Sequence, residues 1–178
     1  TTSFPAASNW DVRLQNAMWH WNNVKSSGFL FYVGRDTDGY HASGNGINEV
    51  YLSSTEVGSA LAVTKKSLSC YWWFGWKRGI VEADIAFNSN LIWSTGPYDY
   101  NTPSDAPYNF EGVALHELGH ALGLSHENRW QSTMNSYYPG GGPLGYYKEW
   151  DPLADDRRGA HYLYADGTSE IDIGASAL

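Results

Sequence analysis

Cysteine and positively charged residues are both scarce in this sequence. Cys70 is the only cysteine among 178 residues, so no intrachain disulfide can form. We interpret it as a small residue packed among the aromatics of SLSCYWWFGW rather than as a reactive thiol. The 11 lysines and arginines are outnumbered by 19 acidic residues, which gives a formal net charge of −8. The cations never cluster beyond a pair, which argues against binding of nucleic acid or an anionic membrane.

Long apolar runs are also missing. No stretch of 18 apolar residues is present, so the sequence predicts no transmembrane helix. The opening TTSFPAASNW has neither the basic start nor the apolar stretch of a signal peptide. The chain is therefore expected to be either intracellular or the mature form of a secreted protein whose leader has been removed. Hydrophobic residues make up 42% and charged residues 17%, which indicates one folded domain.

Three segments, 8–27, 110–122 and 151–164, carry the signals of helices. Each begins at a residue whose side chain can accept a hydrogen bond from the first turn, and these N-caps are Ser8, Asn109 and Asp151. The second helix is expected to end at Gly123, because glycine tolerates the positive φ of a helix stop. The third has proline directly after its cap, at the first helical position.

Short apolar or alternating runs between the first two helices predict strands. They lie at 29–34, 47–53, 60–65 and 79–88. The segment RDTDG (35–39) is either a calcium loop or a polar turn, and the turn is favoured because the downstream glutamate of an EF-hand is lacking. The order of helix, strands, helix, loop and helix predicts an α+β domain.

Three of the six histidines lie within EGVALHELGHALGLSHENRW. His116 and His120 are four residues apart, so a helix places both on one face, where they can bind one metal ion. Glu117 can reach a water on that metal without occupying a coordination position. Gly123 permits a sharp turn that brings His126 back to the metal. Three nitrogen ligands and an open fourth position are typical of a catalytic zinc site.

The full pattern HExxHxxGxxH is much more specific than HExxH alone, since it fixes five residues across eleven positions. A coincidental match and a purely structural metal are the alternatives. The other histidines, His20, His41 and His161, are interpreted as surface or packing residues. Nothing in the sequence resembles a Ser/His/Asp triad, a phosphate-binding loop or a cysteine-based zinc knuckle.

With these residues the chain resembles the metzincin metallopeptidases, whose signature is HExxHxxGxxH followed by a methionine-containing turn, here STMNSY with Met134. The spacing of eight residues from His126 to this methionine is similar to that of the matrixins, the matrix metalloproteinase type. VEADIAF (81–87) resembles the matrixin strand at the upper rim of the cleft. PLADDRRGAHYLY resembles the matrixin C-terminal helix with its paired acids, here Asp155 and Asp156.

The resemblance implies an α+β, metzincin-like (zincin) fold. Its parts would be a twisted, mostly parallel sheet with an antiparallel edge strand, an active-site helix, and a small C-terminal lobe with one helix. The single catalytic domain, 1–178, would divide into an upper lobe, 1–123, and a lower lobe, 124–178. One catalytic zinc ion is implied. The structural zinc of matrixins is in doubt because 88–110 contains no histidine, and calcium is an alternative without a clear motif.

By the same resemblance, the chain is expected to be a secreted, monomeric zinc endopeptidase that cleaves proteins or peptides, with Glu117 as general base. Substrate would bind as an added strand along an edge near 81–87, beside Ala83 and Ile85. A non-catalytic binding protein on the same scaffold is one alternative, which the presence of the glutamate disfavours. An intracellular peptidase with few partners is another.

Two further expectations concern the lower lobe. Residues 135–147, including Tyr137 and Tyr138, would line the pocket for the side chain after the cleaved bond. In astacins and serralysins a tyrosine two residues beyond the methionine binds zinc, but Ser136 stands there in this chain, so the resemblance implies no tyrosine ligand. Finally, one carboxylate is expected to bind the ammonium of Thr1. The candidates are Asp156, Asp155 and the astacin-like Glu127.

Overall fold

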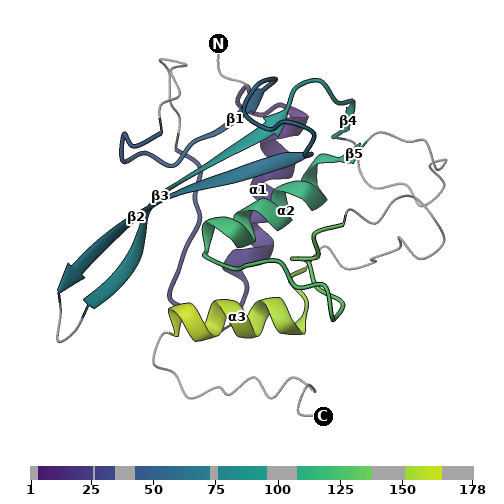
Figure 1. Ribbon diagram of the computed structural model, residues 1–178. Coiled ribbons are helices and arrows are strands. Elements are labelled where there is room, and N and C mark those ends of the chain that lie inside the picture. Colours follow the sequence, from purple (N-terminus) through teal and green to yellow (C-terminus); the bar gives the residue numbers. More distant parts are fainter. Residues whose placement is uncertain are drawn as a thin grey trace.

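The computed structural model describes residues 4–25, 27–34, 43–72, 76–95, 108–137 and 151–165 (Figure 1). Within these ranges the helices are α1 (Asn9–Asn22), α2 (Phe110–Ala121) and α3 (Ala154–Tyr164). The main sheet contains β1 (Val50–Ser53), β2 (Ala62–Trp72) and β3 (Trp76–Asn88). A second, two-stranded sheet pairs β4 (Trp93–Ser94) with β5 (Tyr108–Asn109), which leads directly into α2.

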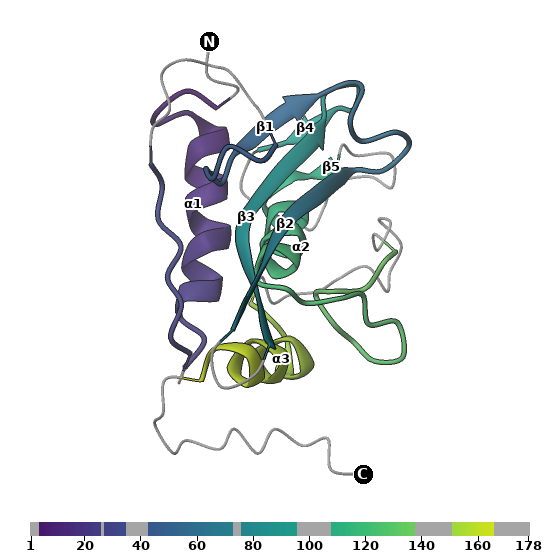
Figure 2. The same cartoon turned by 60° about the vertical axis from the view of Figure 1, so that its left-hand side comes forward.

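The main sheet is mixed and has the order β1-β3-β2. β1 runs parallel to β3, whereas β2 runs antiparallel to β3. The expected antiparallel edge strand is thus β2, while the described sheet holds one parallel and one antiparallel pairing rather than mostly parallel ones. β1 pairs only with the last four residues of β3, from Ile85 to Asn88, so β2 and the first part of β3 continue beyond it as a two-stranded ribbon (Figure 2).

The expectation that residues 81–87 form an exposed edge is wrong. They lie in β3, the central strand, because the chain folds back as a hairpin that pairs β2 with one side of β3. On the other side, the N–H of Ala83 donates to the Asn48 side chain (2.8 Å) and that of Ile85 to the Glu49 carbonyl (2.8 Å). Both side chains are buried, so neither residue is positioned to contact a substrate. Among the described strands, β2 carries the unpaired edge next to α2.

The predicted strand at 29–34 is also not formed. This segment is extended, but it is held by a side chain instead of by a neighbouring strand. The Asn22 amide donates to the carbonyl of Phe31 and accepts from its N–H, both at 2.7 Å. Phe29 and Phe31 pack against the core, which explains the apolar pattern of the segment. The strand predicted at 47–53 begins later, at Val50, while those predicted at 60–65 and 79–88 extend into the hairpin ribbon.

The helix starts predicted from local residues are confirmed for α1 and α2. The Ser8 hydroxyl and the Asn109 amide oxygen each accept a hydrogen bond from a backbone N–H three residues later, at 3.3 and 3.0 Å. Gly123 has φ +100° and follows the end of α2, as predicted. The first helix, predicted over 8–27, ends earlier, at Asn22.

α3 begins at Ala154, after the predicted start. Asp151 does not cap it, because the N-cap position is that of Leu153. The Asp151 carboxylate binds His20 instead, with 2.6 Å between Oδ1 and Nδ1. Asp156 instead accepts a hydrogen bond from the N–H of Leu153 at 2.9 Å, which satisfies a free donor at the start of the helix.

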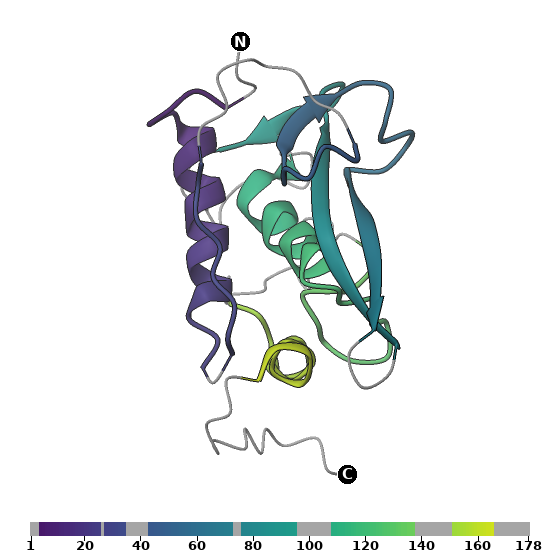
Figure 3. The same cartoon turned by 90° about the vertical axis from the view of Figure 1, so that its left-hand side faces the viewer.

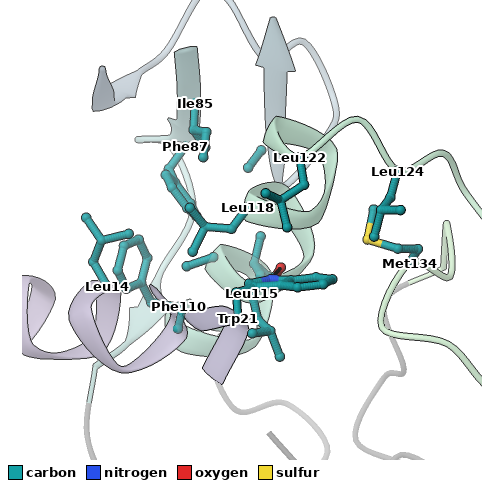
Figure 4. Packing of buried hydrophobic residues seen from close by; sticks show 14 of the residues in the cluster. Leu14, Trp21, Ile85, Phe87, Phe110, Leu115, Leu118, Leu122, Leu124 and Met134 are labelled. Atoms are coloured by element: carbon teal, nitrogen blue, oxygen red, sulfur yellow. Dashed lines mark hydrogen bonds between the residues drawn. The ribbon is translucent and has the colours of Figure 1, made fainter. Parts of the chain in front are cut away.

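The core lies between α1, α2 and the sheet. α2 is placed between α1 and the hairpin of β2 and β3 (Figure 3). Trp21 of α1 is fully buried, and its indole N–H donates to the carbonyl of Leu115 at 2.8 Å (Figure 4). Phe110, at the start of α2, packs edge-on and tilted against neighbouring aromatic rings. This packing fixes α2 on both of its long sides, which makes it a rigid support for the side chains that it carries.

Two remaining expectations concern single features. Cys70 is exposed on β2, so its interpretation as a packed residue is wrong. A bulge at Ser67 and Leu68 shifts the register of the hairpin just before it. None of the helices within the described ranges combines the length and the apolar character that crossing a membrane requires.

Candidate metal centre

Three histidines converge at the C-terminal half of α2. His116 and His120 project from one face of the helix, and His126 returns to them after the turn at Gly123. One ring nitrogen from each lies within 4.8 Å of the others, and the Nε2 atoms of His120 and His126 are 3.0 Å apart. Two nitrogens at zinc-ligand distance in a tetrahedral site would be about 3.3 Å apart, so this spacing fits a single ion.

Backbone carbonyls fix the orientation of two of these rings. The Nδ1 atom of His116 lies 2.8 Å from the carbonyl oxygen of Thr133, and that of His120 lies 2.8 Å from the carbonyl oxygen of Leu124. Because a carbonyl oxygen can only accept, each Nδ1 must carry the hydrogen. Each Nε2 then presents its lone pair toward the shared centre, which is the form that binds a metal.

Burial favours the same form of these two histidines. It lowers the pKa of His116, partly opposed by the hydrogen bond to Thr133, and it lowers the pKa of His120 in the same way. A lowered pKa keeps an imidazole neutral near pH 7, and only the neutral ring offers a lone pair to a metal. Two neutral imidazoles whose Nε2 atoms face the centre, together with the ring of His126 beside them, form a set of nitrogen donors that fits zinc.

Glu117 lies beside the three histidines and is buried. Burial raises the pKa of its carboxyl, while the hydrogen bond from Thr64 and the nearby rings of His120 and His126 act in the opposite direction. The Thr64 hydroxyl donates to Glu117 Oε2 at 2.6 Å. Thr64 was not among the site residues predicted from the sequence. In the strand, the Thr64 side chain lies on the same face as buried Ala62. A hydroxyl on a buried face needs a hydrogen-bond partner, and this was the feature of the sequence that could have pointed to Thr64.

The segment with Met134 forms a turn beneath α2. The N–H of Asn135 donates to the Ser132 carbonyl at 3.2 Å, and the Met134 side chain is buried in the core. Asp156 organises this turn: its carboxylate accepts from the Ser132 hydroxyl (2.5 Å) and from the N–H groups of Thr133 (2.8 Å) and Met134 (3.3 Å). The same turn supplies the Thr133 carbonyl that orients His116. Asp156 therefore links α3 to the metal centre.

The expected contact between a carboxylate and Thr1 falls outside the described residues. Within them, Asp156 binds the methionine turn and the start of α3. Glu127 binds the Arg129 guanidinium (2.9 Å) and its N–H (2.7 Å), and this hydrogen bonding lowers the pKa of the Glu127 carboxyl.

The wall predicted at 135–147 is described only as far as Tyr137, which is exposed. Tyr138 lies outside the described residues. Ser136 bonds Asn128, with 3.0 Å from its hydroxyl to Oδ1. The absence of a tyrosine ligand therefore stays a prediction. His41 and the RDTDG segment (35–39) also lie outside the described residues.

His20 is an ion-pairing residue rather than the plain surface or packing residue expected. Besides Asp151, it contacts Glu111 of α2 at 3.7 Å, and the Arg13 guanidinium binds the same carboxylate at 3.0 Å. Hydrogen bonds that His20 donates to the Glu111 and Asp151 carboxylates raise the pKa of His20. No sequence pattern predicts this group of ion pairs, because its members lie far apart along the chain.

Comparison with known proteins identifies the family of this chain. The family model described as Matrixin matches residues 4–165. The chain is 34% identical to mouse matrix metalloproteinase-25 over 84 residues, which are 47% of this chain and 12% of that protein. It is 33% identical to the human matrix metalloproteinase-25 over 84 residues, 47% of this chain and 14% of the relative. It is 32% identical to rat stromelysin-3 over 83 residues, which are 47% of this chain and 14% of that protein. The matched segments thus cover only a small part of these relatives. The family model, in contrast, matches most of this chain, which therefore belongs to the matrixin family of metalloendopeptidases.

Proposed function

We propose that this chain is a zinc-dependent endopeptidase in which His116, His120 and His126 hold one catalytic zinc ion. The observation that carries the proposal is the convergence of the three rings, with Nδ1 of His116 and His120 turned to backbone carbonyls so that both Nε2 atoms face the centre. Membership of the matrixin family supports the same conclusion.

The chemistry divides between the ion and the chain. Zinc bound there would polarise the scissile carbonyl and lower the pKa of a water molecule from 15.7 to about 7. Glu117 is the group that would accept the proton from the attacking water and then deliver it to the leaving amine. Its burial beside the histidines and its single hydrogen bond from Thr64 support this role. Glu117 acts as the general base and does not need to bind the metal.

The substrate would lie along β2 rather than along 81–87. β2 has an unpaired edge among the described strands, and its Thr64 touches Glu117. An extended peptide that pairs with this edge is carried past the metal centre, and main-chain pairing positions it without demanding a sequence. The exposed Tyr137 side chain is available to contact it.

The remaining parts of the proposal concern organisation. One catalytic domain, 1–178, would comprise an upper lobe, 1–123, that contains the sheet and α2, and a lower lobe, 124–178, that contains the methionine turn and α3. In Figure 1, α3 lies at the end of the domain opposite to β1. We further propose that the protein acts on protein substrates outside the cell, as a monomer.

Metal analysis combined with cleavage profiling on a peptide library tests the proposal. The wild-type protein should bind one zinc ion and cleave peptides. His120→Ala should lose the metal, and Glu117→Ala should keep it while turnover falls by about 10²-fold or more. Near-normal turnover of Glu117→Ala would contradict the mechanism. Stoichiometric zinc without any cleavage by the wild-type protein would support the alternative of a non-catalytic binding protein.

A further inference from the structure

We propose that Thr64 is a positioning residue for Glu117, an inference that rests on the proposed function. Among the described residues, it is the Thr64 side chain that donates a hydrogen bond to the Glu117 carboxylate. Thr64 lies on β2, whereas Glu117 lies on α2. The hydroxyl would hold one carboxylate oxygen so that the other is aimed at the reacting water. The acid–base step would then depend on a strand that contributes no metal ligand.

The geometry shows which acceptor receives the hydroxyl hydrogen. Thr64 Oγ1 lies 2.6 Å from Glu117 Oε2 and 3.1 Å from the Glu117 main-chain oxygen. A hydroxyl has a single hydrogen, and the main-chain oxygen belongs to α2, where helix carbonyls accept from an N–H one turn later. The shorter contact to a carboxylate is the stronger one. The hydrogen is therefore directed to Oε2.

The second carboxylate oxygen stays available. No described residue donates a hydrogen bond to Glu117 Oε1. Among the described residues, every side-chain oxygen that is fully shielded from solvent has a hydrogen-bond partner. Since Oε1 has no such partner, it must be accessible to solvent. One oxygen is thus held by the protein and the other can exchange a proton with water at the centre. This division suits a general base that must accept a proton and release it again.

Both ends of the contact are rigidly supported. At position 64, β2 pairs with Ile85 of β3, a fully buried residue in the core. Glu117 lies in the middle of α2, between two histidines whose rings are bonded to backbone carbonyls. A glutamate side chain has three rotatable bonds, and the hydroxyl restricts them. Without the hydroxyl, the carboxylate would be free to adopt other staggered rotamers about these bonds.

Two substitutions separate positioning from packing. Thr64→Val keeps the shape and removes the hydroxyl, whereas Thr64→Ser keeps the hydroxyl and removes a methyl group. If Thr64 positions Glu117, the valine variant should lose about tenfold in kcat, a part of the 10²–10⁴-fold that acid–base catalysis contributes. Its KM should change by less than about twofold, with one zinc ion still bound. Thr64→Ser should restore kcat to within about threefold of wild type. Thr55→Val, a matched change at an exposed site, should leave both constants unchanged.

A readout independent of activity is the melting temperature of the zinc-free protein in a double-mutant cycle. Thr64→Val should lower it in the wild-type background, because Glu117 loses its donor, and should have a smaller effect in the Glu117→Ala background. Additive effects would overturn the inference, as would a Thr64→Val enzyme with wild-type kcat, or Ser and Val variants that are equally impaired. If the valine variant does not fold, Thr64→Ala compared with Thr64→Ser isolates the hydroxyl, since both variants lack the methyl group. Substantial turnover by Glu117→Ala would instead overturn the proposed function itself.

Discussion

Met134 occupies the space that a side chain on Gly119 would need. A β-carbon added to Gly119 would lie 2.3 Å from the sulfur of Met134 and 2.9 Å from the ring of Trp21. Gly119 is on α2 between His116 and His120, so its missing side chain lets the methionine turn approach the helix backbone directly below the metal centre. Figure 4 shows Met134 at the side of the core toward Leu124.

We expect Gly119→Ala to destabilise the protein, although alanine is the better helix former. Alanine gains about 1 kcal/mol of helix propensity over glycine. Forcing a methyl group into a filled core costs about 1–3 kcal/mol, and both Met134 and Trp21 are buried with little room to move. The free energy of unfolding, measured with urea, should therefore fall. In a Met134→Ala background the loss should be smaller, since the obstructing sulfur is gone. A gain in stability from the single change would contradict this packing.

Asp156→Asn should weaken both the fold and the metal centre. The carboxylate holds three groups of the methionine turn as well as the start of α3, and hydrogen bonds to a charged group contribute about 1.5–3 kcal/mol each. An amide can accept at only one of its two ends, so we expect a loss of about 2 kcal/mol or more by urea unfolding. Zinc affinity, measured by competition with a chelator, should fall about 10-fold or more, because the turn orients His116. Asp155→Asn is the matched control and should change stability by less than about 0.5 kcal/mol.

The metal centre could be read from the sequence more completely than the sheet could. His116, His120 and Gly123 follow one another on a single helix and its stop, where local geometry determines which side chains meet. The caps Ser8 and Asn109 are equally local. The position of β3 at the centre of the sheet is not, because it depends on which strands pair, and the alternation of 79–88 is the same in either position.

Contacts that join distant parts of the chain were missed for the same reason. Thr64 reaches Glu117 across 53 positions, and Asp156 reaches Ser132 across 24. The apolar run around Phe31 is typical of a strand, but it arises because Phe29 and Phe31 pack against the core. Its actual partner, the Asn22 side chain, leaves no periodic trace in the sequence.

Two neighbouring carboxyl groups on β3, those of Glu82 and Asp84, should make the stability of the protein depend on pH. Burial raises the pKa of Asp84 to about 6, assisted by its hydrogen bond with Glu82. The N–H groups of Gly44 (2.5 Å) and Gly46 (2.6 Å) bind Glu82 and lower the pKa of its carboxyl, so Asp84 is the member of the pair that takes up the proton. Because the folded pKa of Asp84 lies above its ordinary value of 3.8, its contribution to stability is complete below that value and is lost as pH rises through about 6.

Asp84→Asn tests this assignment, since the amide mimics the protonated acid and can still donate to Glu82. The variant should be more stable than wild type near pH 8, and the difference should shrink toward pH 5, as measured by urea unfolding across that range. Asp155→Asn serves again as the control and should show no such trend. A wild-type protein that remains the more stable one at pH 8 would refute the assignment.

The ion pairs of His20 should produce a second pH dependence at higher pH. His20 of α1 is held between Glu111 of α2 and Asp151 ahead of α3, with Arg13 on the far side of Glu111. Hydrogen bonds that His20 donates to the two carboxylates raise the pKa of His20 above 6.5, although partial burial acts in the opposite direction. The ion pairs therefore contribute fully below about pH 6.5, and their contribution is lost as pH rises through the folded pKa. His20→Gln removes the charge, so the stability difference between wild type and this variant should be largest near pH 6 and decline toward pH 8.5.

Asp151→Asn should lower the folded pKa of His20, as measured by NMR titration of the imidazole. The decline in the stability difference should then move to lower pH. A difference that is constant with pH would show that His20 stabilises the junction of the three helices by packing and hydrogen bonding rather than by its charge.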